Sequence, residues 1–183
     1  MTVPVPDPVA EAAAYQASLL AALGDDDPAE VQAQTPALIR LLVADAGDAL
    51  RVAPAPGEWS ALECIAHLVD GALVVAARSR WILAEDEPDI VGYDQDLWVS
   101  VLRQVGEDPG QLIAVFDALR RWDLALWGRT TPEQRARVGV HRERGPESYE
   151  LTFRLAAGHD RVHLAQAHRA LEAARAAGAG AGR

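Results

Sequence analysis

Large apolar residues recur every three or four positions along two central segments of the chain. They are, in order, Leu62, Ile65, Val69 and Leu73, then Leu112, Val115 and Leu119. This spacing places each set on one face of an α-helix. Half of the residues are apolar and only 5% are aromatic, a composition that favours helices rich in alanine and leucine over a β-sandwich. We therefore predict an all-α fold.

A short polar residue followed by proline marks the expected helix starts. Such pairs are Asp7-Pro8, Asp27-Pro28, Thr35-Pro36, Asp108-Pro109 and Thr131-Pro132. The polar side chain caps free N–H groups of the first turn, where proline loses nothing by lacking its own N–H. Ser60 and Glu63 have the spacing of a capping box for a further helix. The pattern predicts helices near 8–23, 36–49, 60–85, 109–128 and 147–177.

The connections between these helices are short or of medium length. The segment 51–59 is too rich in proline to be helical, 85–98 contains at most a short helix, and 139–148 forms a turn or small hairpin. Residues 1–7 and 178–183 are expected to be flexible. Four long helices joined in this way predict a single domain built as a four-helix bundle, in which sites arise from side chains on facing helices.

The charge balance argues against a polyanionic partner. The chain has 17 basic and 27 acidic residues and a net charge of −10, so we expect no nucleic-acid binding. The local exception is a basic cluster, made up of Arg135, Arg137, Arg142 and Arg144. Neighbouring glutamates offset this cluster, so a solvated loop is favoured over a phosphate site.

The cysteine content and the N-terminal sequence bear on the compartment. Cys64 is the single cysteine, so an internal disulfide is excluded. The first residues lack the basic and uninterrupted apolar stretches of a leader, and no run reaches the roughly 18 apolar residues that a membrane span needs. We expect a cytoplasmic protein with no membrane partner, and a homodimer is left open.

Three of the five histidines lie close together near the end of the chain. His159 and His163 are four residues apart, so on a helix they lie about 40° apart with β-carbons about 6 Å from one another. Both imidazoles can then bind one metal ion. His168 falls nearly on the opposite side of the helix. The alternative is that the pair consists of two half-exposed polar residues on an amphipathic helix.

A catalytic zinc site uses a third protein ligand and keeps one position open. His67 is the best candidate, because it lies mid-helix among apolar residues. Glu63 and Asp70 flank it by one turn, where a carboxylate can orient the imidazole or supply an oxygen ligand. A buried histidine bonded to a carboxylate is an equal alternative. His141, in a loop between glycines, is interpreted as structural or exposed and not as a ligand.

Three stretches resemble the DinB-like superfamily, most closely its YfiT-type branch of metal-dependent enzymes. They are Pro-Gly-Glu-Trp-Ser at 56–60, His67 with Leu68 and Asp70, and Gly-His-Asp-x-x-His-Leu-x-Gln at 158–166. The resemblance runs from about Gln16 to Leu171 and includes 93–98 and 137–145. One departure lies in the second of these segments, where many relatives have His-Pro-Glu and this chain has His141-Arg142-Glu143.

The resemblance implies an up-up-down-down four-helix bundle that binds a divalent metal, commonly nickel or zinc, through three histidines. All three ligand positions match, so it implies that His67, His159 and His163 form the metal site. Characterised members of the superfamily include S-transferases and isomerases that use bacterial low-molecular-weight thiols. The departure at His141 leaves the geometry of that loop open, but not the ligand set.

A neutral site of three histidines leaves the positive charge of the ion on its open positions, so a thiol or water bound there loses its proton near neutral pH. Our preferred hypothesis is transfer of a small thiol, such as bacillithiol or mycothiol, to an electrophilic substrate. Cys64 is expected to pack in the core, so the thiol would come from outside. The alternatives are hydrolysis by metal-activated water and a non-catalytic metal-binding or stress-response bundle.

Three more residues are candidates for contact with a small-molecule substrate. Arg78 lies almost on the same helix face as His67 and about 16 Å further along the axis, where it can hold a substrate carboxylate. A surface or packing arginine is the commoner alternative. Tyr93 and Trp98 lie in the 85–98 segment and can cover the site, although an ordinary packed loop explains them equally well.

Overall fold

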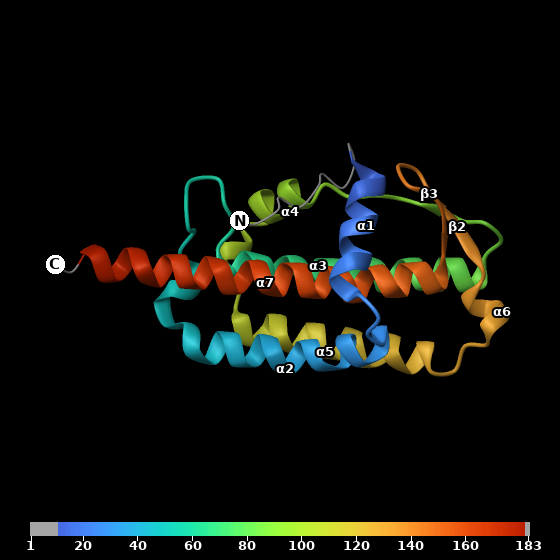
Figure 1. Cartoon of the computed structure of the whole chain (residues 1–183), viewed down its shortest axis with the longest axis horizontal. Helices are drawn as coiled ribbons and strands as arrows, with labels where there is room; N and C mark the ends of the chain where they lie inside the picture. Colours follow the sequence, from blue (N-terminus) through green and yellow to red (C-terminus); the bar gives the residue numbers. More distant parts are fainter. Residues whose placement is uncertain (1–10, 182–183) are drawn as a thin grey trace.

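The computed structural model describes residues 11–181, and this part of the chain is mostly helical (Figure 1). Its elements are α1 (Ala12–Leu23), α2 (Pro28–Ala46), η1 (Gly47–Arg51), α3 (Ala61–Ala84), β1 (Asp89–Ile90), α4 (Gln95–Val101), η2 (Gln104–Gly106), α5 (Pro109–Trp127), α6 (Pro132–Arg135), β2 (Val138–His141), β3 (Gly145–Ser148) and α7 (Tyr149–Ala181). The predicted helical fold, with extra short helices, is confirmed. The predicted start at Asp7-Pro8 lies outside the described residues.

The long helices α2, α3, α5 and α7 form a four-helix bundle, in which α7 packs on α2 and α3, and α5 packs on the same two helices (Figure 1). Gln32 bonds the Phe153 carbonyl near the start of α2 and α7, and Arg175 bonds Asp45 near their ends, so these helices are parallel. In Figure 1, α3 and α5 run the other way.

The helix order is therefore up-down-down-up, and the expected up-up-down-down order is wrong. The reason lies in the connections. A short link, residues 47–60, reverses the chain between α2 and α3, as short links between packed helices do. The longer link, residues 85–108, returns along the bundle before α5 begins, so α5 runs parallel to α3 (Figure 1).

The start of α2 differs from the prediction at Pro36. The helix begins at Pro28, after Asp27 caps its first turn with a hydrogen bond of 2.7 Å. Thr35, which was the predicted cap, turns its hydroxyl back to the carbonyl of Val31 at 2.9 Å. Pro36 then lies inside the helix and withholds one N–H from the hydrogen-bond ladder. The upstream cap fixes the start, and packing maintains the helix across the proline.

The core stripes of α3 and α5 are partly different from the predicted ones, although the capping box that starts α3 is confirmed. Leu73 and Val115 are 53% and 49% exposed, so their assignment to the core is wrong. The buried stripe of α3 continues through Ala72 and Ala76, and that of α5 includes Arg120. Small and charged residues thus occupy core positions that a search for large apolar residues does not find.

Helix α1 crosses α7 at Gly158 (Figure 1). A Cβ atom at this position would lie 2.0 Å from the carbonyl oxygen of Leu19, so only glycine permits the close approach. The crossing allows Tyr15 and Leu19 to pack on Leu155 of α7. It therefore brings α1 over the segment of α7 that contains the paired histidines.

The chain between α3 and α7 also forms a small sheet. β1 pairs with β2 in parallel, and β2 pairs with β3 in an antiparallel hairpin, as predicted for 139–148. Gly145 makes the turn with a φ of +78°, a conformation that favours glycine. Because β2 contacts α3 and β3 contacts α7, the hairpin places His141 and Glu147 beside the bundle.

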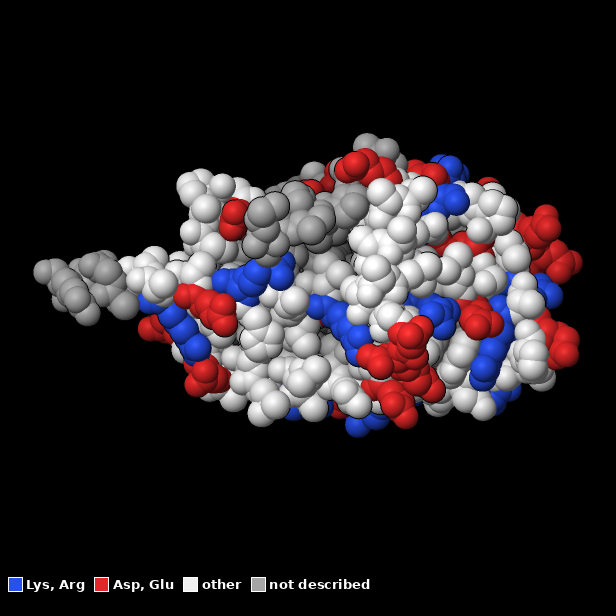
Figure 2. All heavy atoms as spheres, in the orientation of Figure 1, with Lys and Arg blue, Asp and Glu red and all other residues white. Residues whose placement is uncertain are grey.

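Charges of both signs are interspersed on the face shown in Figure 2, where the described residues form no continuous basic surface. This agrees with the net charge of −10. No helix in the described part of the chain is long and apolar enough to cross a membrane. The exclusion of nucleic acid as a partner stays a prediction.

Candidate metal centre

Three imidazoles from two helices meet inside the bundle. His67 comes from α3, and His159 and His163 come from successive turns of α7. One nitrogen of each ring lies within 4.8 Å of a nitrogen of the other two, and Nε2 of His67 is 2.9 Å from Nε2 of His159. The structure thus brings the three predicted ligands into a group that can hold one metal ion, while His168 is exposed.

Burial keeps these imidazoles neutral. It lowers the pKa of His163 to about 4. Burial and the neighbouring imidazoles also lower the pKa values of His67 and His159 well below the ordinary range. Neutral imidazole is the form that binds a metal. A set of imidazole nitrogens suits zinc, nickel, copper or iron and does not suit magnesium or calcium.

Only one of the two ring nitrogens of His163 forms a hydrogen bond with another described residue. Its Nδ1 donates to Oε1 of Gln166 at 2.9 Å, so Nε2 keeps its lone pair. That Nε2 is buried and has no hydrogen-bond partner in the described part of the chain. Such an orphaned buried atom is uncommon, and coordination to a metal ion would satisfy it. The residues present therefore fit a metal.

The two carboxylates that flank His67 on α3 bond other groups. Glu63 accepts from the N–H of Ser60 at 2.8 Å and from its hydroxyl at 2.7 Å. Asp70 accepts from the side-chain amide of Gln104. Among the described residues, no hydrogen bond therefore supports the predicted role of these carboxylates toward His67.

Trp59 is a neighbour of the cluster to which sequence reasoning assigned no role. The centroid of its ring lies 5.0 Å from that of His67 and 6.0 Å from that of His163. The sequence did contain a signal for the location of Trp59. This residue directly precedes Ser60, and the capping box of Ser60 and Glu63 fixes how the chain enters α3. Trp59 covers one side of the imidazole cluster.

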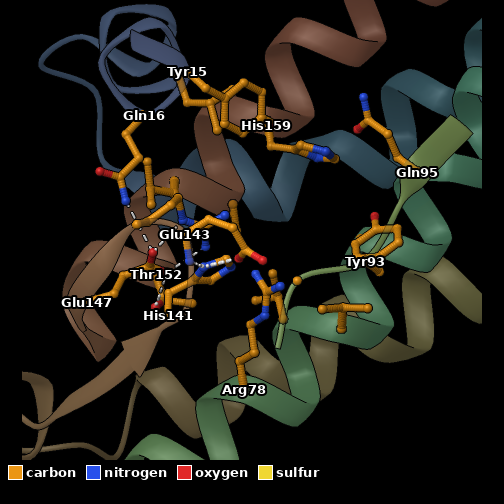
Figure 3. A pocket seen from close by; sticks show the side chains of 18 of the residues that line it. Tyr15, Gln16, Arg78, Tyr93, Gln95, His141, Glu143, Glu147, Thr152 and His159 are labelled. Atoms are coloured by element: carbon orange, nitrogen blue, oxygen red, sulfur yellow. Dashed lines mark hydrogen bonds and ion pairs between the residues drawn. The ribbon is translucent and has the colours of Figure 1, made fainter. Parts of the chain in front are cut away.

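A cavity of about 100 Å³ lies beside the imidazoles and is lined in part by His159 (Figure 3). Gly71 of α3 makes room for that ring, since a Cβ atom there would lie 3.1 Å from Cε1 of His159. Apolar side chains from three helices form part of its wall: Leu19, Val74, Val75, Leu155 and Ala156. The cavity extends from the candidate metal centre to a region lined by charged and polar side chains.

The end of the cavity away from His159 is polar (Figure 3). Arg144 holds Glu147 through two contacts of 2.8 and 3.2 Å. Nδ1 of His141 lies 2.9 Å from Oε2 of Glu143. His141 was interpreted as structural or exposed, and the structure shows it to be 2% exposed. Burial, together with nearby arginines, lowers its pKa to about 4.

The predicted substrate-contacting residues have different places. Arg78 and Tyr93 line the cavity, and Trp98 does not belong to its lining. Trp98 instead packs on Tyr93, with ring centroids 4.5 Å apart, while the Tyr93 ring lies 6.3 Å from that of His67. Trp98 thus supports a residue of the wall, and contact of Arg78 and Tyr93 with a substrate stays a prediction.

A buried ion pair that sequence reasoning missed lies next to His159. Asp160 of α7 accepts from Arg120 of α5, and the two side chains are 1% and 2% exposed. Arg120 also donates to the amide oxygen of Gln32 in α2 at 3.1 Å. This network ties three bundle helices together at the level of the imidazoles, and Arg120 also lines the cavity.

Both the sequence and the fold of this chain match known proteins. The sequence profile of the DinB superfamily matches residues 29–167. The chain belongs to the DinB superfamily. A solved structure of YfiT from Bacillus subtilis, described as a probable metal-dependent hydrolase with an unusual four-helix bundle topology, is similar with a TM-score of 0.74. The match covers 82% of this chain and 86% of YfiT at 24% identity, so it supports the fold alone. No curated protein matches by sequence.

Proposed function

We propose that this DinB-superfamily chain is a metal-dependent enzyme in which His67, His159 and His163 hold one divalent ion, zinc or nickel. The observation that carries the proposal is the orphaned Nε2 of His163, buried in a cluster of three neutral imidazoles. The cavity beside His159 supports catalysis over a closed structural site, because it gives a small molecule space next to the cluster.

Two residues beside the imidazoles, Gln166 and Trp59, support metal binding at this centre. Gln166 fixes the tautomer of His163, and the ring of Trp59 packs beside the rings of His67 and His163. When bound, the ion would supply a Lewis acid that lowers the pKa of a thiol or water and so yields a nucleophile near neutral pH. The cavity wall then determines which electrophile reaches the centre.

A small thiol is our first proposal for the nucleophile. No carboxylate of the described residues joins the three imidazoles, and the carboxylate of Asp160, next to His159 in the sequence, is paired with Arg120. A thiol, with an ordinary pKa of about 8.5, needs less help to ionise than water does. The thiol comes from solution, as bacillithiol or mycothiol would, because burial raises the pKa of Cys64 to about 12.

Hydrolysis is the second candidate. The similar Bacillus subtilis structure is described as a probable metal-dependent hydrolase, and its bundle matches that of this chain. In this reaction water, and not a thiol, would be the nucleophile, and it would cleave an ester or amide. Product analysis separates the two reactions.

The test uses the full chain loaded with zinc or nickel. In one arm, 1-chloro-2,4-dinitrobenzene and a thiol react to form a thioether; the C–Cl bond breaks, chloride leaves and the thiol proton goes to solvent. In the other arm, 4-nitrophenyl acetate and water form acetate and 4-nitrophenol. We expect metal-dependent thioether formation that falls at least about a hundredfold in His163→Ala. The control is His168→Ala, an exposed histidine on the same helix.

Metal-dependent product in the ester arm alone would make hydrolysis the function and would contradict thiol transfer. Equal rates for the parent and His163→Ala in both arms would contradict the enzymatic proposal as a whole.

A further inference from the structure

Arg78 of α3 is a buried arginine that has no ion-pair partner within residues 11–181. It is 7% exposed, its Nη2 donates to the carbonyl of Val91 at 2.9 Å, and its Nε is enclosed with no hydrogen-bond partner. Among the described residues, no carboxylate lies within ion-pair distance of its guanidinium. A buried charge normally has a partner of opposite sign.

Glu143 and Glu147 are the acidic residues whose charges act on the Arg78 guanidinium, but neither lies within ion-pair distance of it. Glu147 binds Arg144 instead. The carboxylate of Glu143 lies against Nδ1 of His141 at 2.9 Å. Among the described residues, neither carboxylate therefore pairs with Arg78, and its guanidinium is available to a ligand.

Arg78 lines the same cavity as His159, and its guanidinium points into the cavity from α3 (Figure 3). Gly71, Val74 and Val75 lie between the two ends along the same helix and form a floor of small side chains. Helical side chains lean toward the helix N-terminus, so Arg78 leans toward the turn that contains His67. A single small molecule can thus contact both ends of the cavity.

We propose that Arg78 binds the carboxylate of a small organic acid whose reacting bond lies at the imidazole end of the cavity. The planar guanidinium matches a carboxylate in two parallel hydrogen bonds. A monoanion fits better than a dianionic phosphate, because Glu143 and Glu147 line the same end. This proposal rests on the proposed function for the reaction, and the carboxylate belongs either to the electrophile or to the thiol.

The first experiment measures binding of hexanoate and of its neutral analogue, hexanamide, by NMR titration of the full chain. The chain is free of metal, because a carboxylate also ligates zinc. We expect hexanoate to bind at least tenfold more tightly than hexanamide, and Arg78→Gln to abolish that preference. Arg78→Lys keeps part of the preference. Arg80→Gln is the matched control, since Arg80 lies on the same helix, binds Asp123 and does not line the cavity.

Equal affinity of the parent for hexanoate and hexanamide would overturn the proposal, as would an unchanged preference in Arg78→Gln. If Arg78→Gln does not fold, the preference of the parent and its reduction in Arg78→Lys decide the outcome. Failure of metal binding would defeat the proposed function and leave this binding result intact, so the two failures are distinguishable.

A second experiment, with the metal-loaded chain, identifies the source of the carboxylate. One arm compares 3-mercaptopropionate with 3-mercaptopropionamide as the thiol, and the other compares 4-chloro-3-nitrobenzoate with 4-chloro-3-nitrobenzamide as the electrophile. We expect Arg78→Gln to raise KM at least tenfold for the acid in one of the two arms and for neither amide. No change in either arm would contradict a role for Arg78 in the reaction.

Discussion

Nε2 of His67 lies 2.9 Å from Nε2 of His159, although 92 positions separate the two residues in the sequence. Antiparallel packing of α3 on α7 creates this contact, and His163 completes the group one turn further on. Because burial holds all three rings neutral, the cluster is a set of lone-pair donors and not a cationic patch.

Gln166 should control the metal affinity of the cluster. In Gln166→Leu, Nδ1 of His163 loses its acceptor, so the tautomer that directs the Nε2 lone pair to the metal is no longer fixed. We expect zinc affinity to fall by about ten- to a hundredfold, which a competition titration with a coloured chelator measures. Glu172→Ala, at an exposed position of the same helix, is the control. A change below about twofold would contradict this role for Gln166.

Removal of one partner from the pair of Arg120 and Asp160 should destabilise the fold strongly, whereas replacement of both by apolar residues should destabilise it much less. Arg120→Met leaves a buried carboxylate without a partner and should lower the free energy of unfolding by about 3–5 kcal/mol. The double variant Arg120→Met with Asp160→Leu should lose clearly less than the sum of the single variants. Arg121→Ala, whose side chain is 73% exposed, should change stability by less than about 1 kcal/mol. Additive losses in chemical denaturation would argue against the pairing.

Gly158 should be required for docking of α1. In Gly158→Ala the new methyl group would meet the Leu19 carbonyl oxygen at 2.0 Å, so α1 must move away from α7. We expect a loss of about 3 kcal/mol or more in thermal unfolding, and faster proteolysis between α1 and α2. Gly178→Ala, on the same helix with nothing within 4 Å, should be neutral or stabilise by up to about 1 kcal/mol. Similar behaviour of the two variants would rule out the crossing.

His141 should make stability depend on pH. Its folded pKa of about 4 lies below the ordinary 6.5, so between these values the unfolded chain binds the proton more readily. Stability that is present above 6.5 is therefore lost as pH falls toward 4. Compared with the parent, His141→Gln should lose less unfolding free energy between about pH 7 and about pH 4.5, by about 1.4 kcal/mol or more. The other histidines are the same in both proteins, so their contributions to the difference cancel. An equal loss in both proteins would contradict the prediction.

The sequence predicted the features that depend on local geometry. The pair His159 and His163 needs only the pitch of one helix, and the capping box of α3 needs only Ser60 and Glu63. The predicted start of α2 was wrong, because Thr35 and Asp27 are similar capping residues and packing decides between them. Local sequence patterns of this kind carry no information about tertiary packing.

The features that depend on tertiary contacts were less predictable. Charged Arg120 occupies a core position because Asp160 meets it from another helix, which no spacing along α5 reveals. The polar end of the cavity likewise forms only when the hairpin places Glu147 beside α7. The expected helix order, which the resemblance implied, was wrong; the patterns of the helices do not determine this order, because it depends on the links between them. Its place mid-helix among apolar residues made His67 the best candidate for the third ligand, but a buried structural histidine was an equal alternative, and only the resemblance to the DinB-like superfamily favoured the ligand.

Metal analysis of the purified chain, repeated on His163→Ala and His168→Ala, tests the central claim most directly. The account predicts about one equivalent of zinc or nickel in the parent and in His168→Ala, and at least about a tenfold loss of affinity in His163→Ala. Equal metal content in His163→Ala and the parent, or no bound metal in any of the three proteins after reconstitution, would contradict it.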